Sequence, residues 1–282
     1  MTFFYKDILE EKIKLLYDFH NIYLLAKGED KQNYKHIFDR LCLVAKTIIP
    51  FVKPSWAIIN KIKERGLNIL FEGAQGTFLD IDHGTYPFVT SSNTVSSQAG
   101  IGAGLGPTSI HYTIGITKAY TTRVGSGPFP SEDDSENGIK LGKQGKEFGT
   151  VTGRKRRCGW FDAVLVKQAV ALSSIDGIAF TKLDVLDGFE KIKICTGYTL
   201  DQRKINYLPT ASCEQKKIKP IYEVMKGWST SIKGIQSFNK LPKEAKDYIS
   251  RIEELINCKI IIISTSPERS DTIILDNPLK NN

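Results

Sequence analysis

The sequence lacks any long uninterrupted run of apolar residues. Its longest aliphatic block, Ile260 to Ile263, is four residues long, which suits a buried strand and is too short to span a bilayer. The N-terminal segment also lacks the basic start, apolar centre and small-residue cleavage site of a secretory signal. These absences predict a soluble protein of the cytoplasm that has no membrane partner.

Cysteine and histidine are both scarce. The five cysteines are odd in number and widely spaced, and they include no Cys-x-x-Cys pair, so the sequence gives no support to a zinc site or a redox motif. We expect free thiols in a reducing compartment. His83 has no second histidine near it in the sequence, and we therefore predict no metal site.

Positive charge is what the sequence has in excess. The net charge is +8 and the isoelectric point about 9.1, a balance that suits an anionic partner. Most lysines are scattered, but Arg154 to Arg157 form one basic run that follows Gly153. A tight run beside a glycine suits a small polyanion better than a long duplex, which requires a broader basic stripe. A nucleic-acid-binding module is accordingly the last-ranked alternative.

The pattern of apolar residues changes along the chain. The opening third has the helical spacing of apolar residues, whereas later segments alternate between strand and helix patterns, beginning with a predicted strand at Asn68–Phe71. Such alternation predicts an α/β fold with a mainly parallel central sheet flanked by helices. We expect a helical segment over 1–66 and an α/β region over 67–282, together one continuous domain. The helices expected in the opening third cover 7–27, 33–49 and 54–65.

Two polar motifs suggest nucleotide and anion recognition. Thr181-Lys182-Leu183-Asp184 follows a predicted strand, and its carboxylate can accept hydrogen bonds from N1–H and the 2-amino group of guanine, donors that adenine lacks. The stretch from Gly149 to Arg157 combines glycines, which allow close approach to a ligand, with arginine forks for carboxylate or phosphate. Taken alone, each motif is equally consistent with a solvated turn or loop.

Two further motifs follow predicted strands. The segment Phe71 to Pro87 contains Asp80 and Asp82, which could act as an acid/base pair, although such residues more often cap helices and satisfy loop backbone. Ser264-Thr265-Ser266-Pro267 could line a base pocket or could simply form a turn. Ligands of open α/β sheets bind where strands end, so the position of all four motifs favours a binding site.

The order of these motifs along the chain resembles that of adenylosuccinate synthetases. The resemblance covers essentially the whole chain and implies a P-loop NTPase-like fold of that family, from which the N-terminal strand and the phosphate loop are missing here. It also implies a ligase of purine and AMP biosynthesis. GTP, a substrate, phosphorylates the 6-oxygen of IMP, and the amine of L-aspartate then displaces the phosphate to give adenylosuccinate. The matching segments are 71–94, 121–130, 153–160, 181–188, 220–223 and 264–267.

The resemblance assigns binding roles residue by residue. It places Gln75, Thr90 and Arg154 on IMP. It places Thr150, Val151, Thr152, Gly153, Arg154, Lys155 and Arg156 on aspartate. It places Arg156, Lys182, Leu183, Asp184, Ser264, Thr265 and Ser266 on GTP. Two positions depart from the family pattern: Val151 replaces a threonine, and Ser266 replaces a glycine in the turn that holds the base.

The family's glycine-rich phosphate loop does not occur in this sequence. The nearest similar segment, Gly142 to Lys146, does not follow a predicted strand and lacks the Ser or Thr after its lysine. The family's catalytic base and acid and its Mg²⁺ ligands belong to the same missing part, so we expect no catalytic residue here, although the family uses Mg²⁺. The resemblance thus implies a homodimeric enzyme chain that is incomplete alone and acts only with the N-terminal part, which is either supplied by a separate polypeptide or lost through truncation. The alternative is a non-catalytic remnant that binds guanine nucleotide or IMP.

Overall fold

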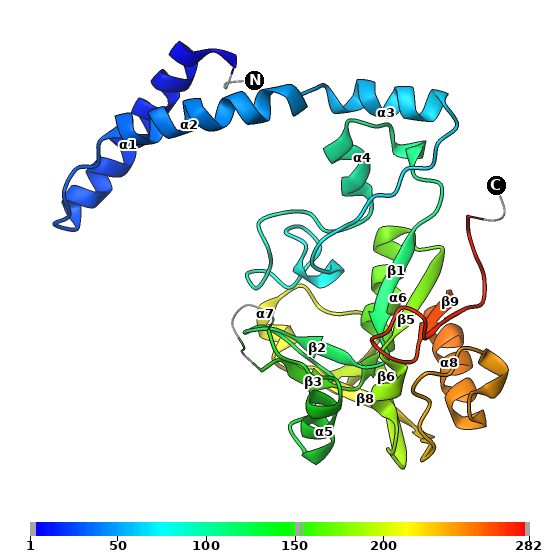
Figure 1. The fold of residues 1–282 in the computed structure, drawn as a ribbon. Helices are drawn as coiled ribbons and strands as arrows, with labels where there is room; N and C mark the ends of the chain where they lie inside the picture. The colour runs from blue at the N-terminus through cyan, green and yellow to red at the C-terminus, as the bar shows by residue number, and fades with distance from the viewer. Residues whose placement is uncertain (1–3, 150–152, 154, 280–282) are drawn as a thin grey trace. The chain divides into compact units, whose positions relative to one another are not determined.

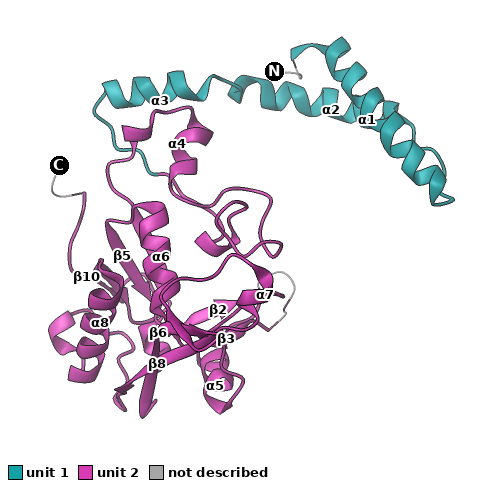
Figure 2. Ribbon diagram, turned by 180° about the vertical axis from the view of Figure 1, so that it is seen from behind, with its two compact units in different colours: residues 1–70 teal, residues 71–282 magenta. Residues whose placement is uncertain are grey.

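The computed structural model describes residues 4–149, 153 and 155–279, and the chain divides into two compact units (Figures 1 and 2). The first unit covers Met1–Leu70 and the second covers Phe71–Asn282. The first contains the helices α1 (Lys6–Ala26), α2 (Tyr34–Ile48) and α3 (Ser55–Glu64), with the short 3-10 helix η2 (Ile49–Phe51) between the last two.

The helices of the first unit agree with the sequence prediction to within one or two residues. Asn33 caps α2, since its side chain accepts a hydrogen bond from the backbone N–H of Lys35. Helices α1 and α2 contact each other, and the Tyr34 hydroxyl donates to a Glu10 carboxylate oxygen at 2.8 Å. This unit is therefore a helical hairpin extended by a third helix.

One helical stretch in the first unit is long and apolar enough to cross a membrane by length and composition alone. It runs over Tyr34–Glu64, with a mean hydropathy of 1.4 in its most apolar window. The expectation from uninterrupted apolar runs missed this stretch, because an average over a window tolerates interruptions such as Lys46 and Pro50. Only 6% of this window is buried inside the structure, and a single such helix is weak support for a membrane segment.

A mainly parallel sheet forms the centre of the second unit, which confirms the predicted fold class. Its strand order is β1-β5-β9-β10; the first three strands are parallel, and β10 is antiparallel to β9. Strand β9 carries four consecutive isoleucines, three of them buried, as expected of a strand covered on both faces. The strands are β1 (Ile114–Lys118), β5 (Gly177–Thr181), β9 (Lys259–Ser264) and β10 (Thr272–Ile274).

A second sheet and a two-stranded ribbon complete the strands of this unit. In the second sheet, β4 runs parallel to β6, while β7 and β8 are antiparallel to β6. In the ribbon, β2 and β3 are antiparallel. The sheet contains β4 (Phe161–Asp162), β6 (Lys191–Leu200), β7 (Arg203–Ile205) and β8 (Lys219–Lys226), and the ribbon contains β2 (Thr121–Arg123) and β3 (Arg157–Gly159).

Helices α6 and α8 join the two sheets into one core (Figure 1). They contact each other, α6 packs on β6, and α8 packs on both β8 and β9. Buried Phe180 of β5, Ile194 of β6 and Tyr248 of α8 belong to the same apolar cluster. The α-helices of this unit are α4 (Ser97–Ala103), α5 (Glu136–Gln144), α6 (Ala163–Ser173), α7 (Ser212–Gln215) and α8 (Lys243–Ile256); the 3-10 helices are η3 (Thr77–Leu79), η4 (Pro107–Ser109), η5 (Leu183–Leu186) and η6 (Phe238–Lys240).

The strand predicted at Asn68–Phe71 is wrong. The backbone there adopts no regular structure, and Leu70 is 90% exposed. An apolar run favours an extended chain, but a strand also requires a neighbour that satisfies its backbone hydrogen bonds. Among the described residues, no strand pairs with this segment.

Asp162 is a buried carboxylate that links β4 to α6. It accepts hydrogen bonds from the backbone N–H of Leu165, at 3.1 Å, and from the hydroxyl of Tyr198, at 2.9 Å to each oxygen. Burial raises the pKa of Asp162 to about 6, because these donors offset only part of the desolvation cost of the charge. At neutral pH Asp162 is therefore mostly ionised, although the folded protein is more stable when this carboxyl is protonated.

We expect Asp162 to lower the stability of the fold as the pH rises. The folded pKa lies above the ordinary value of 3.8, so stability should be highest below about pH 4 and should fall by about 3 kcal/mol as the pH passes through 6. In Asp162→Asn, whose side-chain oxygen can still accept from Leu165, this decline should vanish. Urea unfolding at pH 4 to 7 measures it, with Asp201→Asn on an exposed turn as the control. Equal pH slopes in Asp162→Asn and the parent would contradict the assignment.

Candidate functional site

The candidate site lies at the carboxyl ends of the parallel strands β1, β5 and β9. Lys118 and Thr181, the last residues of β1 and β5, are register partners. The backbone N–H of Lys182 donates to the hydroxyl of Ser264 at the end of β9, at 3.1 Å. The structure thus brings together the two sequence motifs 181–184 and 264–266, at the edge where open α/β sheets bind ligands.

The turn after β5 holds two carboxylates with different surroundings. Asp187 accepts hydrogen bonds from Trp228 Nε1, the Ser231 hydroxyl and the backbone N–H of Ile232, at 2.7 to 3.0 Å. In contrast, Asp184 has no side-chain donor as a hydrogen-bond partner in the described part of the chain, and partial burial raises the pKa of its carboxyl. Asp187 therefore stabilises the turn, whereas Asp184 keeps its acceptor oxygens for a ligand.

The remaining residues predicted to hold guanine are largely used by the fold itself. The Leu183 side chain is buried in the core, so only its backbone could meet a ligand. The buried Thr265 hydroxyl donates to backbone oxygens of Ile235 and Asp271. The hydroxyl of Ser266 donates to the Asp271 carboxylate at 2.7 Å and accepts from the backbone N–H of Glu268. The hydroxyl that Ser266 adds is therefore satisfied within its own turn.

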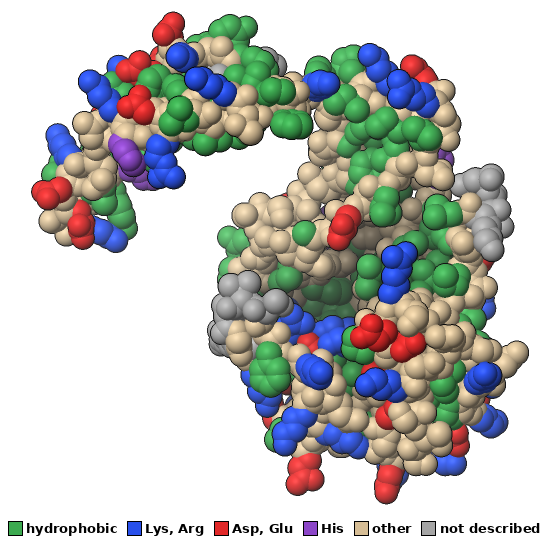
Figure 3. All heavy atoms as spheres, in the orientation of Figure 1, with side chains coloured by type: hydrophobic (Ala, Val, Ile, Leu, Met, Phe, Trp, Pro, Cys, Tyr) green, Lys and Arg blue, Asp and Glu red, His purple; other side chains and the backbone are tan. Residues whose placement is uncertain are grey.

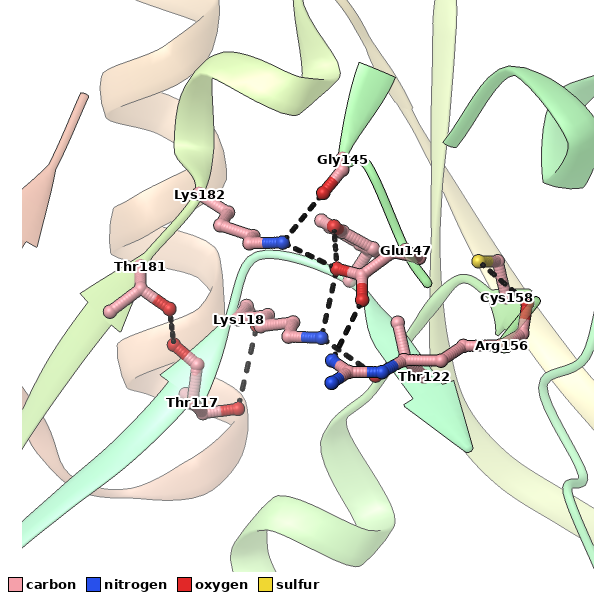
Figure 4. A network of polar contacts seen from close by, with 10 residues as sticks. Thr117, Lys118, Thr122, Gly145, Glu147, Arg156, Cys158, Thr181 and Lys182 are labelled. Atoms are coloured by element: carbon pink, nitrogen blue, oxygen red, sulfur yellow. Dashed lines mark hydrogen bonds and ion pairs between the residues drawn. The ribbon is translucent and has the colours of Figure 1, made fainter. Parts of the chain in front are cut away.

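Glu147 lies at the centre of a polar network beside this turn (Figure 4). One carboxylate oxygen accepts from Lys118 Nζ at 2.9 Å, from the Tyr120 hydroxyl at 2.5 Å and from Lys182 Nζ at 2.7 Å. The other oxygen accepts from Arg156 Nη1 at 3.0 Å. Two predicted ligand-binding residues, Arg156 and Lys182, thus meet on one carboxylate that the sequence interpretation did not single out.

The electrostatics of this network follow from burial and from hydrogen bonding. The Glu147 side chain is fully buried, which by itself raises its pKa, but the donors on Lys182, Tyr120 and Lys118 outweigh burial and lower the pKa to about 2. Burial also lowers the pKa of Lys118 and, together with Glu147, raises that of Tyr120. The carboxylate is therefore ionised at neutral pH, and three cationic side chains share it.

Arg156 retains hydrogen-bond donors that the network does not use. Its Nε is buried and has no hydrogen-bond partner among the described residues, although Nη1 is bound to Glu147. Figure 3 shows a hollow on the face of this unit where β1 and β2 lie, with Lys and Arg as well as Asp and Glu side chains below it. A guanidinium that keeps unpaired N–H groups suits a carboxylate or phosphate ligand.

The structure describes only some residues of the rest of the predicted basic loop. The binding roles predicted for Thr150, Val151, Thr152 and Arg154 concern positions that lie outside the described residues. Gly153 adopts a positive φ of 63°, a conformation that favours glycine. Lys155 is exposed and forms an antiparallel bridge with Phe148, and therefore lies next to the segment that carries Glu147.

Two of the three residues predicted to contact IMP, Gln75 and Thr90, lie in the loop that follows Phe71. Gln75 is exposed and has a positive φ of 63°, and the Thr90 backbone N–H donates to the Leu79 carbonyl at 2.8 Å. Among the described residues, no hydrogen bond or ion pair connects either of them to Arg156 or Lys182. Buried Asp80 organises the loop by accepting from several backbone N–H groups, which identifies it as a structural residue and not as half of an acid/base pair.

Arg123 and Arg157 connect this loop to the ribbon. From β2, Arg123 donates to the Thr85 hydroxyl and the Phe88 carbonyl. From β3, Arg157 forms an ion pair with Glu132 and donates to the carbonyls of glycines 125 and 127. Neither arginine was assigned a role from the sequence, because their partners lie 25 to 38 positions away. The basic run therefore contains both Arg156, which faces the site, and Arg157, which supports the fold.

The described residues do not fit a magnesium site. No group of three His, Cys, Asp or Glu side chains in the described part of the chain could hold a metal ion. Mg²⁺ prefers carboxylate and water oxygens, but the Glu147 carboxylate is already shared by three cationic side chains. These three cationic side chains would repel a further cation at Glu147. The described residues are therefore not suited to hold Mg²⁺ for a reaction.

Comparison with known proteins shows consistent similarity to one family. A family model described as adenylosuccinate synthetase matches residues 1–273. The structure of a fully ligated adenylosuccinate synthetase from Plasmodium falciparum is 32% identical, with a TM-score of 0.87, over 96% of this chain and 63% of that one. A cyanophage S-2L succinoaminodeoxyadenylate synthetase is 17% identical, with a TM-score of 0.49, over 80% and 52%. The chain thus spans less than two thirds of each of these relatives.

Proposed function

This chain belongs to the adenylosuccinate synthetase family, and from that premise we propose that it supplies the substrate-recognition part of a GTP-dependent ligation of L-aspartate to IMP. The product is adenylosuccinate, an intermediate of purine biosynthesis. The observation that carries the proposal is the Asp184 carboxylate after β5, to which no described side chain donates a hydrogen bond, in the same turn as Lys182, which shares the Glu147 carboxylate with Arg156. Guanine recognition and anion recognition then occur at one edge of the sheet.

Guanine recognition follows from the chemistry of the Asp184 turn. A carboxylate can accept two parallel hydrogen bonds from N1–H and the 2-amino group of guanine. Adenine presents an unprotonated N1 and no 2-amino group to the same carboxylate, so it would leave both oxygens unpaired. Lys182 lies at the start of the same turn, and its stem can cover the flat face of the base. GTP is therefore the nucleoside triphosphate substrate in this proposal.

Recognition of IMP and aspartate is assigned to the basic loop and to the loop after Phe71. The Arg156 side chain is partly exposed and is bound to Glu147 through Nη1, so its remaining exposed donors can meet a carboxylate or phosphate in this proposal, and we extend this role to Arg154 and to residues 150–153 by family membership. Gln75 and Thr90 are assigned to IMP on the same basis. We also propose that the chain acts as a homodimer in the cytoplasm, as the family relationship suggests.

The proposal predicts base-selective nucleotide binding by the purified chain. In calorimetric titrations, GDP and GTP should bind at least about 100-fold more tightly than ADP and ATP, because the adenine nucleotides leave the Asp184 carboxylate unpaired. IMP should bind as well, and formation of adenylosuccinate from IMP, aspartate and GTP, followed by absorbance, measures the complete reaction. Binding without turnover would indicate a guanine-nucleotide- or IMP-binding protein of the same ancestry. Equal affinity for GDP and ADP, or salt-dependent binding to nucleic acid alone, would contradict the proposal.

A further inference from the structure

Glu147 contacts residues of three separate segments that converge on the candidate site. Lys118 ends β1, Lys182 follows β5, and Arg156 directly precedes β3, and each donates to the Glu147 carboxylate within 3.0 Å. Glu147 is not among the residues predicted from the sequence to bind a ligand, and the proposed function does not require it. It is nevertheless the shared partner of the guanine-side lysine and the anion-side arginine.

The contacts of Glu147 restrict both of these long side chains. Lys182 has a left-handed backbone conformation with φ of 57°, and its ammonium group donates to both Glu147 and the Gly145 carbonyl at 2.7 Å. Two of its three N–H donors are therefore fixed. Arg156 is held at Nη1, and its backbone N–H also donates to the Glu147 carbonyl at 2.9 Å. Each side chain would otherwise lose about 2 kcal/mol of rotamer entropy when a ligand ordered it.

We propose that Glu147 is a positioning residue that prepares Lys182 and Arg156 for their ligands and thereby couples guanine recognition to anion recognition. The proposal rests on the proposed function for the identity of the ligands. The buried carboxylate contributes one negative charge to three cationic groups, so it holds them in place while leaving an excess of positive charge for anions. Loss of the carboxylate charge should release both side chains together.

The first experiment replaces Glu147 by Gln in the full chain and titrates it with GDP and, separately, with L-aspartate, the ligand assigned to Arg156. We expect each affinity to fall about 10-fold, which corresponds to about 1.4 kcal/mol. The control is Glu132→Gln, which removes the carboxylate partner of Arg157 on the neighbouring ribbon and should leave both affinities unchanged. Unchanged affinities in Glu147→Gln, or equal losses in the two variants, would overturn the proposal.

A double-mutant cycle separates positioning from a general structural role. In a Lys182→Met background, the further change Glu147→Gln should reduce GDP affinity by less than it does in the parent, because one of the two side chains that Glu147 positions is already absent. The effect on L-aspartate affinity should persist in that background, since Arg156 is still present. Additive losses of GDP affinity, accompanied by a lower Tm, would mean that Glu147 supports the fold only.

Chemical labelling tests positioning without any nucleotide. Acetic anhydride should modify Lys182 in Glu147→Gln about 10-fold faster than in the parent or in Glu132→Gln, because an amine that is no longer held by a buried carboxylate is more accessible to the reagent. Peptide mass spectrometry measures the rate. If the parent chain binds neither GDP nor IMP, the proposed function fails, whereas the labelling rate still decides whether Glu147 positions Lys182. An unchanged rate would overturn the positioning role.

Discussion

Replacing Asp184 by Asn will reduce the affinity of the chain for GDP and GTP by at least about 100-fold, the equivalent of about 3 kcal/mol. An amide keeps one acceptor oxygen but presents an NH₂ group where the second oxygen stood. That group would face a guanine donor, so one hydrogen bond is lost and two donors oppose each other. Hydrogen bonds to charged groups contribute about 1.5 to 3 kcal/mol each, and the remaining bond also loses its charge.

The same substitution should create affinity for a different base. Xanthine carries N1–H beside a carbonyl at position 2, so it offers one donor and one acceptor where guanine offers two donors. The Asn side chain complements that pair in the orientation the carboxylate had. Asp184→Asn should therefore bind xanthosine diphosphate more tightly than GDP, and competitive calorimetric titration measures this exchange of preference.

Asp187 provides the matched control in the same turn. Asp187→Asn makes the identical chemical change three positions along, on a carboxylate bound to Trp228, Ser231 and Ile232. It should lower the stability of the turn and leave the ratio of GDP to xanthosine diphosphate affinity as in the parent. A GDP affinity of Asp184→Asn within about threefold of the parent's would be a difference of less than about 1 kcal/mol in binding free energy. That result would show that Asp184 does not bind the guanine base.

The Asp184 turn could be predicted because residues that are adjacent in the sequence determine it. A buried strand followed by Lys and Asp specifies both the position of the turn and the chemistry of its carboxylate, and β5 confirms the strand. The sequence predicted Asp184 as the guanine ligand but gave no structural role to Asp187, because the donors on Asp187 come from residues 41 to 45 positions away. The alternation of strands and helices was likewise local enough to predict the mainly parallel sheet.

Glu147 could not be predicted for the opposite reason. It lies between α5 and the basic loop, in no regular pattern, and its partners Lys118 and Lys182 are 29 and 35 positions distant. Only the parallel pairing of β1 with β5 brings these lysines to the same edge. The error at Asn68–Phe71 has a related origin, since an apolar run records a preference for extended backbone and contains no information about the neighbouring strand that it requires.

Asp80→Ala should cause the largest loss of stability of the variants considered. The Asp80 side chain is buried and accepts hydrogen bonds from the backbone N–H groups of Asp82, His83, Thr94 and Val95. Burial raises its pKa, but these donors outweigh burial and lower the pKa to about 2. Removing the carboxylate leaves four backbone donors unpaired, one of them in a buried and three in a partly buried hydrogen bond, and we expect a loss of about 4 kcal/mol.

The loss should be visible both as unfolding and as a binding defect. A change of this size corresponds to a fall in Tm of about 10 °C for a unit of this length. Thr90 lies between the two chain segments that Asp80 holds together, so IMP affinity should fall more than GDP affinity. Because the folded pKa of Asp80 lies below its ordinary value of 3.8, its stabilisation is present above about pH 4 and is lost as the pH falls toward 2.

Asp82 distinguishes a specific role of Asp80 from a general need for acidic residues in this loop. Asp82 is exposed and accepts one hydrogen bond from the Asn93 side chain, so Asp82→Ala should cost less than about 1 kcal/mol. Asp80→Asn should be intermediate, because its oxygen can keep two of the backbone donors while its NH₂ group opposes the other two. Calorimetric melting of the three variants orders them, and equal Tm values for Asp80→Ala and Asp82→Ala would contradict the role of Asp80. The expected order follows from the number of backbone donors that each variant leaves unpaired. Because four backbone N–H groups meet on Asp80, this one buried carboxylate determines the conformation of a loop that carries predicted IMP-binding residues.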